Sequence, residues 1–356
     1  MTTDMTTNTT TNTTTNTTTS KHCPPNCDPA CSLAEHKLVA LGGGTGLPLI
    51  LRAAQSLGMR PTAVVTMADD GGSTGRLRRE LGLLPPGDVR NCLVALASSE
   101  RAELAHLVDY RFMEGEGIAG HSLGNLMLAA AADDLDSFEQ AVRLFEDLLQ
   151  VQGRVLPSTF EHLTLHGFDR KGEEIYGQAS LTCSTTAIAA VELSPKKPAA
   201  NEEAVDALLQ ADSIIITPGS LFTSIIPNLL IPSIIAAIRN SKARVIYCCN
   251  VANMKGETAN FTAGDYIKTL GRYGLDDCID AVLLPYSMYD ERSVQRLEAA
   301  NVQVLVTALA SAHNSQHHDE HKLASALPAL IEVACTQMSP GGAASSFAAD
   351  LSGGKV

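Results

Sequence analysis

The chain has 356 residues, of which 45% are hydrophobic, and its formal net charge is −13 at pH 7. This length and the mean hydropathy of +0.05 allow a sizeable core in one large domain or two smaller ones. Such an acidic chain is not expected to bind nucleic acid or anionic membranes, because both require a basic face. The chain has no uncharged apolar run of about 18 residues, so no membrane span is expected. No secretory signal is visible. We therefore expect a cytoplasmic protein.

Both ends of the chain have compositions that do not support a packed core. Residues 1–35 begin with a Thr/Asn-rich tract, and 337–356 are rich in Gly, Ala and Ser, so both are expected to be disordered. The first tail also holds His22, Cys23, Cys27 and Cys31. These side chains could bind zinc or an iron–sulfur cluster, but an unstructured tail is favoured because paired Cys-x-x-Cys knuckles are missing.

Strands and helices alternate in the first part of the remaining chain. Apolar runs at 37–41 and 62–67 are typical of buried strands, and a helical pattern over 47–54 lies between them. Residues 137–150 form an amphipathic helix pattern with a capping residue in front of it. This alternation predicts a parallel sheet covered by helices.

The pattern changes between about 151 and 195. Strand-like runs follow one another there with turns between them and no helix pattern, at 151–157, 162–168, 175–182 and 187–193. Consecutive strands joined by short turns predict an antiparallel sheet. We therefore expect a β-rich insertion over about 151–195.

The alternation resumes after residue 200. A helix pattern at 202–210 leads to the apolar runs 213–217, 244–249 and 281–284, and a last helix pattern covers 320–334. The predicted fold is α/β, with a Rossmann-like, doubly wound and mostly parallel sheet. It occupies one domain over 36–336, which contains the antiparallel insertion.

Glycine-rich or polar segments follow four of the predicted strands, at 42–46, 68–76, 218–221 and 250–253. The carboxyl ends of parallel strands meet at one edge of a sheet, so these segments are expected to lie together. One of them alone would be an ordinary turn, but four favour a shared pocket of nucleotide size. Glycines and helix N-terminal amides suit phosphate binding.

Asp69 and Asp70 add negative charge to the second of these segments. Carboxylates close to a diphosphate would repel it, unless a divalent cation such as Mg²⁺ lies between them. They can also accept hydrogen bonds from ribose or sugar hydroxyls, as acidic residues do in dinucleotide sites. A helix cap in an exposed turn is the third interpretation. Both residues are candidates for metal binding and for a catalytic role.

Two further predicted helices open on polar side chains. Asp88 is expected to cap the first, and His121, Ser122 and Asn125 cluster at the start of the second. A buried capping network and a ligand contact are equally compatible with this pattern. Arg76 or Arg90 could grip a phosphate.

The expected nucleotide- and phosphate-binding residues come from all of these segments. They are Gly43, Gly44, Thr45, Gly46, Gly71, Gly72, Ser73, Asp88, Arg90, Asn91, His121, Ser122, Asn125, Gly219, Ser220 and Asn250.

Several common catalytic signatures are missing from the chain. There is no Gly-x-x-x-x-Gly-Lys-Ser/Thr, and Gly42, Gly44 and Gly46 lack the dehydrogenase spacing. There is also no Gly-x-Ser-x-Gly elbow. A histidine-rich stretch near the end is expected to be a polar loop more than a metal site; it contains His313, His317, His318 and His321.

Five long motifs closely resemble those of the YvcK proteins, which are bacterial gluconeogenesis factors within the wider CofD-like family. They occur in the family's order at 41–47, 68–73, 85–91, 120–126 and 218–230. The resemblance covers about residues 36–335 and implies a Rossmann-like fold with a nucleotide-type ligand. For the YvcK branch it implies a cytoplasmic protein that binds UDP-N-acetylglucosamine and is required for growth and cell shape on gluconeogenic carbon, without an established reaction.

For the CofD branch the same resemblance implies a different activity. Those proteins transfer phospholactate from a guanosine-diphosphate-linked donor to a deazaflavin precursor with Mg²⁺, and their aspartates match Asp69 and Asp70. We favour a sugar-nucleotide-binding regulator and keep a Mg²⁺-dependent transferase as the alternative. A dehydrogenase is the least favoured of the three interpretations. The β insertion could also pair across a homodimer.

The chain departs from the YvcK pattern in its last third. Residues 250–258 read Asn-Val-Ala-Asn-Met-Lys-Gly-Glu-Thr instead of Asn-Val-Met-Thr-Gln-Pro-Gly-Glu-Thr. The stretch from about 287 to 305 is shorter, and His317-His318-Asp319 stands where Arg-His-Asp is expected. The resemblance implies that this third contacts the base or the sugar.

Overall fold

The structure is a computed structural model that describes residues 33–335. The predicted disordered tail at 337–356, residues 1–32 of the other tail and the cysteines at 23, 27 and 31 lie outside these residues. Residues 33–35, which were expected to belong to the first tail, are helical. The strands are β1 (Leu38–Gly42), β2 (Thr62–Val65), β3 (Arg154–Pro157), β4 (Thr164–Asp169), β5 (Glu174–Tyr176), β6 (Ile188–Ser194), β7 (Ser213–Ile216), β8 (Arg244–Cys248), β9 (Ala281–Pro285) and β10 (Gln303–Thr307).

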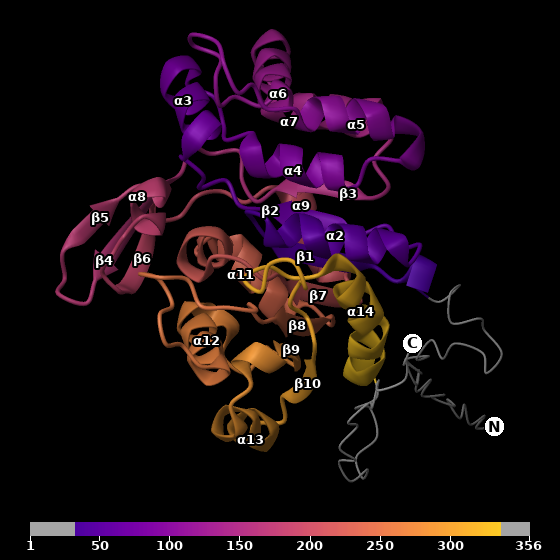
Figure 1. The fold of residues 1–356 in the computed structure, drawn as a ribbon, viewed down its shortest axis with the longest axis vertical. Coiled ribbons are helices and arrows are strands. Elements are labelled where there is room, and N and C mark those ends of the chain that lie inside the picture. Colours follow the sequence, from indigo (N-terminus) through magenta and orange to yellow (C-terminus); the bar gives the residue numbers. More distant parts are fainter. Residues whose placement is uncertain (1–32, 336–356) are drawn as a thin grey trace, which may run out of the picture.

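Helices connect and cover these strands (Figure 1). They are α2 (Gly46–Ser56), α3 (Gly72–Leu81), α4 (Gly87–Ala95), α5 (Ala102–Asp109), α6 (Leu123–Asp134), α7 (Phe138–Leu148), α8 (Gln178–Thr182), α9 (Glu202–Gln210), α10 (Ile226–Leu229), α11 (Pro232–Asn240), α12 (Ala263–Leu270), α13 (Glu291–Ala299) and α14 (Glu320–Cys335). Short 3-10 or π turns occur at Ser99–Arg101, Leu221–Ile225, Gly271–Leu275 and Tyr286–Met288.

The main sheet is parallel and has seven strands in the order β10-β9-β8-β7-β1-β2-β3. Strand β1 lies in the middle, where Leu41 pairs with Val64 of β2 and with Ile216 of β7. Every residue of β1 and β7 is buried, as expected for apolar strands covered on both faces. The predicted α/β fold with a doubly wound, mostly parallel sheet is confirmed.

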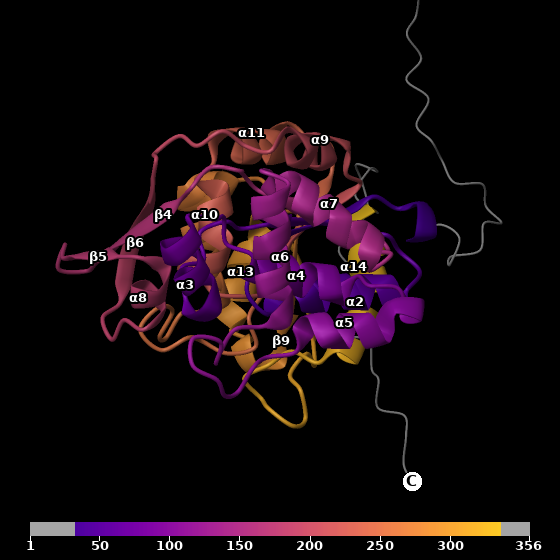
Figure 2. The same ribbon diagram turned by 90° about the horizontal axis from the view of Figure 1, so that it is seen from above.

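Helices cover both faces of this sheet (Figures 1 and 2). Helix α2 packs against α14 on one face, and α9 packs against α11 on the other. The predicted helices at 47–54, 202–210 and 320–334 correspond to α2, α9 and α14. The core consists mainly of branched aliphatic side chains from the strands and from the inner helix faces.

The connection from β2 to β3 is much longer than a single helix. It contains α3 to α7, most of which form the upper part of the molecule in Figure 1. The amphipathic helix predicted over 137–150 is α7, and the Ser137 side chain caps it by accepting a hydrogen bond from the Gln140 N–H. Phe138, Ala141 and Phe145 are buried on its inner face, which explains the periodic pattern.

The insertion is a separate antiparallel sheet with the strand order β5-β4-β6. Two details of its prediction are wrong. The strand predicted at 151–157 is β3, which pairs in parallel with β2 and belongs to the main sheet, because its buried apolar residues extend that core. The run 175–182 is not one strand, since β5 ends at Tyr176 and α8 follows; Gly177 separates them with a φ of +89°.

No single helix in residues 33–335 is both long and apolar enough to cross a membrane. The segments Leu221–Leu229 and Pro232–Asn240 meet that criterion only as a pair, and they are bent by 76° relative to each other.

Candidate functional site

The order of the main sheet reverses between β1 and β7. Strands β2 and β3 lie on one side of this point, and β8 to β10 lie on the other, so the chain continues from β1 and from β7 toward opposite edges of the sheet. Open α/β sheets bind ligands at such a switch point, outside the carboxyl ends of the strands. The predicted segments 42–46 and 218–221 are these loops.

Glycine is required where the two loops meet. A Cβ added to Gly46 would lie 1.7 Å from the Pro218 carbonyl oxygen, and one added to Gly42 would lie 2.0 Å from the Thr217 hydroxyl oxygen. Neither distance is sterically possible, so a side chain at Gly46 would require a loop to move, and one at Gly42 would displace the Thr217 side chain. Close packing accounts for Gly42 and Gly46, whereas Gly44 has a φ of +61° that shapes the turn.

Asp88 lies against this turn instead of capping its own helix. The N-cap of α4 is Pro86, and the Gly44 N–H donates a hydrogen bond of 2.8 Å to Asp88 Oδ2. The predicted cap is therefore wrong, because the carboxylate reaches an amide of the loop after β1. Burial, and then the negative charge of Asp69, raise the pKa of Asp88 to about 6.

Asp69 and Asp70 point to different partners. Asp69 Oδ1 accepts a hydrogen bond of 3.0 Å from the Gly71 N–H, and burial raises the pKa of Asp69. Both oxygens of Asp70 accept hydrogen bonds from the first turn of α8: 2.7 Å from the Ala179 N–H and 3.0 Å from the Gln178 N–H. A cation near Asp69 would have two further acidic neighbours, since the charge of Asp70 raises the pKa of Asp69 and the charge of Asp69 raises that of Asp88.

Three of the predicted residues form a buried polar cluster beside α3. The Asn125 side-chain amide donates a hydrogen bond of 3.1 Å to Ser73 Oγ, which lies 2.8 Å from His121 Nδ1. Ser122 is the N-cap of α6 and accepts from the Asn125 N–H. Burial, followed by the positive charge of Arg76, lowers the pKa of His121, which favours the neutral ring at pH 7. Asn125 Oδ1 is buried and has no hydrogen-bond partner among residues 33–335.

Arg90 and Arg76, the candidates for gripping a phosphate, donate hydrogen bonds to groups of the protein. Arg90 is buried and donates to Asp109 and to the Asn91 side chain. Arg76 donates a hydrogen bond of 2.8 Å to the Ala119 carbonyl in the loop that leads to His121. Of the two, Arg76 is the one whose positive charge lowers the pKa of His121.

The loop after β7 is fixed by the loop after β8. The Gly219 N–H donates to Asn250 Oδ1 at 2.7 Å, and the Asn250 amide donates back to the Gly219 carbonyl at 2.8 Å. Ser220 Oγ donates to Glu257 Oε1 at 2.5 Å, and the Phe222 N–H donates to the same oxygen at 3.0 Å. Glu257 was not among the predicted site residues, although the Gly-Glu-Thr at 256–258 retains the YvcK pattern.

The histidine-rich stretch does not gather into a cluster. His318 lies 3.0 Å through Nε2 from the Cys249 carbonyl oxygen, and burial lowers its pKa to about 4. His313, His317 and His321 are exposed. Within residues 33–335 no group of three or more His, Cys, Asp or Glu side chains is arranged to hold a metal ion.

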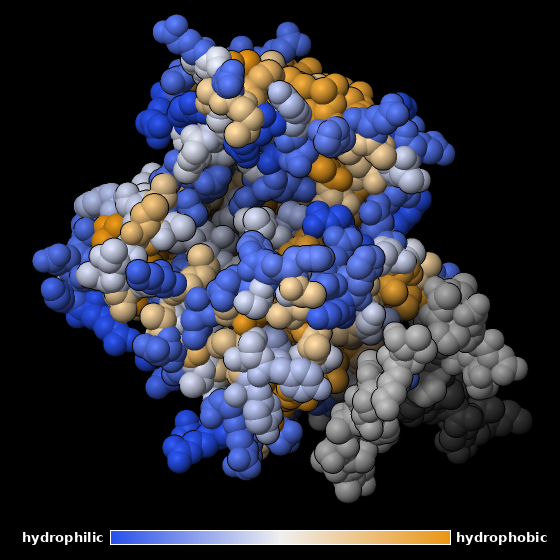
Figure 3. All heavy atoms as spheres, viewed as in Figure 1, coloured by the Kyte–Doolittle hydropathy of each residue, from blue (hydrophilic) through white to orange (hydrophobic). Residues whose placement is uncertain are grey.

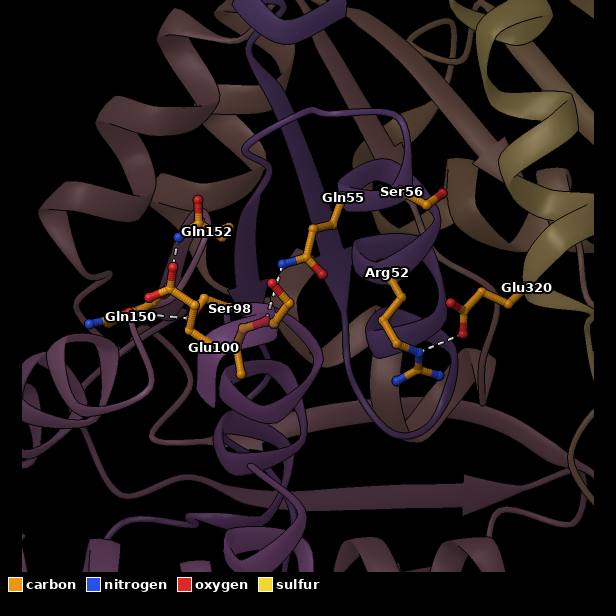
Figure 4. A pocket seen from close by; sticks show the side chains of 10 residues that line it. Arg52, Gln55, Ser56, Ser98, Glu100, Gln150, Gln152 and Glu320 are labelled. Atoms are coloured by element: carbon orange, nitrogen blue, oxygen red, sulfur yellow. Dashed lines mark hydrogen bonds and ion pairs between the residues drawn. The ribbon is translucent and has the colours of Figure 1, made fainter. Parts of the chain in front are cut away.

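The surface is hollowed near the predicted site. Figure 3 shows a largely polar recess between the upper part, which contains α3 and α6, and the body below. A separate cavity of about 620 Å³ lies near the carboxyl end of α2 and the start of α14 (Figure 4). Its wall contains the ion pair between Arg52 and Glu320, with 2.6 Å between Nε and Oε2. None of the predicted site residues lines that cavity.

Comparison with known proteins adds to this geometry. A protein-family model described as 2-phospho-L-lactate transferase CofD matches residues 38–326. The chain belongs to the CofD family. This CofD-family protein superposes on a crystal structure of a Bacillus halodurans protein with a TM-score of 0.76 and 36% sequence identity, covering 83% of this chain and 99% of that chain.

Its relatives carry the name gluconeogenesis factor. The protein is 38% identical over 312 residues to the Bacillus subtilis gluconeogenesis factor, and the aligned region covers 83% of this chain and 98% of that protein. It is 43% identical over 246 residues to the Halalkalibacterium halodurans gluconeogenesis factor, with coverages of 69% and 75%. A Nostoc relative is 45% identical over 249 residues, but the match spans only 54% of the Nostoc protein. The predicted YvcK-type resemblance is confirmed.

Proposed function

We propose that this CofD-family protein binds a nucleoside diphosphate sugar, with UDP-N-acetylglucosamine as the favoured ligand. In this proposal it is a cytoplasmic regulatory protein required for growth and cell morphogenesis on gluconeogenic carbon sources. The observation that carries the binding proposal is the meeting of the loops after β1 and β7 at the switch point of the sheet. The names of the relatives support the link to gluconeogenesis.

The diphosphate is assigned to the two loops at the switch point. Gly44, Thr45 and Gly46 are at the start of α2, and Thr45 is exposed with its hydroxyl not used as a cap. Gly219 lies beside them in the loop after β7, since a Cβ added to it would be 3.6 Å from the Gly43 carbonyl oxygen, and Ser220 follows it in that loop. Helix starts and glycine turns offer backbone amides to anions, which supports this assignment. The Gly44 and Gly219 amides already donate to Asp88 and Asn250, so the neighbouring donors of these loops are the ones assigned to the diphosphate.

Mg²⁺ is proposed as a companion of the diphosphate. Asp69 and Asp88 put negative charge beside the Gly44 turn, so a dianionic ligand would be repelled there without a counter-charge. Mg²⁺ commonly binds one or two carboxylates together with phosphate oxygens. With the cation bound, these side chains would attract the diphosphate through the metal.

The nucleoside or sugar end is assigned to the cluster of Ser73, His121 and Asn125. Its hydrogen-bonding groups are neutral, and Asn125 Oδ1 is an acceptor without a partner. Such a group prefers a hydroxyl or imide donor to a phosphate oxygen. Asn125 is therefore proposed to select for a donor on the ligand.

Isothermal titration calorimetry with UDP-N-acetylglucosamine tests the proposal, with Mg²⁺ and with EDTA. Saturable binding that is tighter with Mg²⁺ is the expected result. Asn125→Leu should weaken it by at least tenfold, since a buried hydrogen bond is worth roughly 1 kcal/mol and an unpaired ligand donor costs more. No saturable binding by the full chain in either buffer would overturn the proposal.

A CofD-like transferase is the second candidate function, and the family match over 38–326 favours it. In that case Mg²⁺ held near Asp69 would neutralise a nucleotide-diphosphate donor while a hydroxyl of the deazaflavin precursor takes the phospholactate group and guanosine monophosphate leaves. The test is incubation of a guanosine-diphosphate-linked lactate donor together with a deazaflavin acceptor, with and without Mg²⁺, and chromatographic measurement of the donor consumed. Donor consumption that depends on Mg²⁺ and is lost in Asp69→Asn would support the transferase. Complete stability of the donor would exclude it.

A further inference from the structure

The two adjacent aspartates after β2 have separate surroundings. Asp69 bonds within its own loop, whereas Asp70 bonds to a segment more than a hundred positions later in the chain. Each oxygen of Asp70 accepts one backbone N–H, from Gln178 and from Ala179. These amides belong to the first turn of α8, where no carbonyl of the same helix can accept from them.

The chain is shaped to bring α8 onto this carboxylate. Gly177, just before the helix, has a φ of +89°, and a Cβ added to it would lie 2.8 Å from Asp70 Oδ2. A side chain at this position would therefore both strain the backbone and push against Asp70. The contact is consequently part of how the insertion is seated.

Further contacts fix the insertion to the same part of the molecule. The Arg78 guanidinium donates to the Asp69 carbonyl at 2.7 Å and to the Leu163 carbonyl, just before β4, at 2.6 Å. On the other side, a Cβ added to Gly256 would lie 1.9 Å from the Ser184 carbonyl oxygen. The segment around α8 therefore lies between the loop after β2 and the 250–258 segment that holds Ser220 through Glu257. Figure 1 shows α8 on the side of the molecule where α3 begins.

We infer that Asp70 is a positioning residue that fastens α8 of the insertion to the rim of the ligand site, and that it does not bind the metal or the phosphate directly. A turn of its carboxylate toward a ligand would leave the partly buried Gln178 and Ala179 amides without this acceptor, which is unfavourable. Asp69 differs in that its partners, the Gly71 N–H and the Thr74 side chain, lie within its own loop and the start of α3 and not in the insertion. The role of α8 as a wall of the ligand site rests on the proposed function, whereas the link between Asp70 and α8 does not.

Hydrogen–deuterium exchange of the full chain without ligand tests the link. In Asp70→Asn, one of the two carboxylate acceptors becomes an N–H₂ donor, so the amides of the 177–183 peptide should exchange at least about tenfold faster. Gly177→Ala should speed exchange in the same peptide from the opposite side of the contact. Asp69→Asn is the matched control and should leave this peptide unchanged. Unchanged exchange at 177–183 in both Asp70→Asn and Gly177→Ala would overturn the inference.

Calorimetry separates positioning from metal binding. A positioning residue predicts that Asp70→Asn weakens binding of UDP-N-acetylglucosamine by the same factor with Mg²⁺ and with EDTA. A metal ligand predicts a loss confined to the Mg²⁺ buffer, and that result would overturn the inference. If the unmodified protein binds no sugar nucleotide, the proposed function fails, but the exchange experiment still decides the role of Asp70.

Discussion

Carboxylates of the protein occupy backbone amides on both sides of the switch point. Asp88 accepts from the Gly44 N–H, and Glu257 accepts from the Phe222 N–H. Amides at such positions are ordinarily the donors that hold a phosphate. A diphosphate at this site must therefore use neighbouring donors, such as the Thr45 hydroxyl. Its negative charge would also be repelled by the Asp88 carboxylate unless that group is protonated or a cation lies between them. This arrangement makes the protonation of Asp88 a property that stability measurements can detect.

Replacing Asp88 by Asn should change how stability depends on pH. The pKa of Asp88 is raised to about 6 in the folded chain, whereas an unfolded Asp has a pKa of about 3.9. Between these values the folded chain keeps a proton that the unfolded chain releases, so this group lowers stability as the pH rises from about 4 to 6. A difference of about two units corresponds to at most about 3 kcal/mol. Asp88→Asn removes this loss and still offers an acceptor to Gly44.

Urea unfolding at pH 4.5 and at pH 7.0 checks this expectation. The variant should gain stability relative to the unmodified protein as the pH rises, while the lowered pKa values of His121 and His318 affect both proteins alike. A difference between the two proteins that is the same at both pH values would contradict the raised pKa of Asp88.

Gly46→Ala should disrupt the contact between the two glycine loops. The added Cβ would lie 1.7 Å from the Pro218 carbonyl oxygen, so one loop must move, at a cost of about 3 kcal/mol. Gly271→Ala is the matched control: Gly271 has a helical φ of −58°, and its added Cβ would meet no atom closer than 3.6 Å. The control should be neutral, or stabilising by up to about 1 kcal/mol. Equal midpoints of urea unfolding for the two variants would refute the role given to Gly46.

Helix starts illustrate what can be predicted locally and what cannot. Ser137, in front of α7, caps its helix within four residues, and the pattern of the sequence reveals it. Glu257 and Asp70 accept hydrogen bonds from the first turns of helical segments that are far from them in sequence, and no local pattern identifies such a pairing. The same limit explains why α8 was predicted as part of a strand. Its apolar residues are few, and its first amides are satisfied from another loop.

Glu257 is expected to stabilise the whole segment from Leu221 to Leu229. Glu257→Ala would leave Ser220 Oγ and the Phe222 N–H without their acceptor in a buried place, and the expected cost is about 3 kcal/mol. Glu257→Gln keeps an acceptor oxygen and should cost about 1 kcal/mol. Chemical denaturation measures both, with Glu298→Ala on the exposed face of α13 as a control that should be nearly neutral. If Gln were as costly as Ala, the charge of Glu257 would matter more than its acceptor.

The arrangement of the whole molecule follows from the order of its strands. The alternation of strand and helix patterns predicts a parallel sheet and, with it, an edge where the polar loops meet. It does not predict which strands are neighbours, because β1 to β3 and β7 to β10 have similar apolar sequences. The structure brings β7 next to β1 and so joins loops from both halves of the chain. The sequence pattern locates these polar loops, whereas the hydrogen bonds between them depend on tertiary contacts between distant segments.

Because the proposed site exists only when both halves of the sheet are assembled, its ligand should stabilise the entire domain. UDP-N-acetylglucosamine at 100 times its dissociation constant would add about 2.7 kcal/mol to the free energy of unfolding. For a domain of this size the melting temperature should rise by about 5 °C, with a single transition. A thermal-shift series over ligand concentration, with UDP-N-acetylglucosamine, GDP and NAD in the presence of Mg²⁺, measures this rise. Gly46→Ala should lose the shift while Gly271→Ala retains it, since only the first change separates the loops after β1 and β7. The same shift in both variants would place the ligand elsewhere, and the cavity beside Arg52 and Glu320 would then be the next site to test.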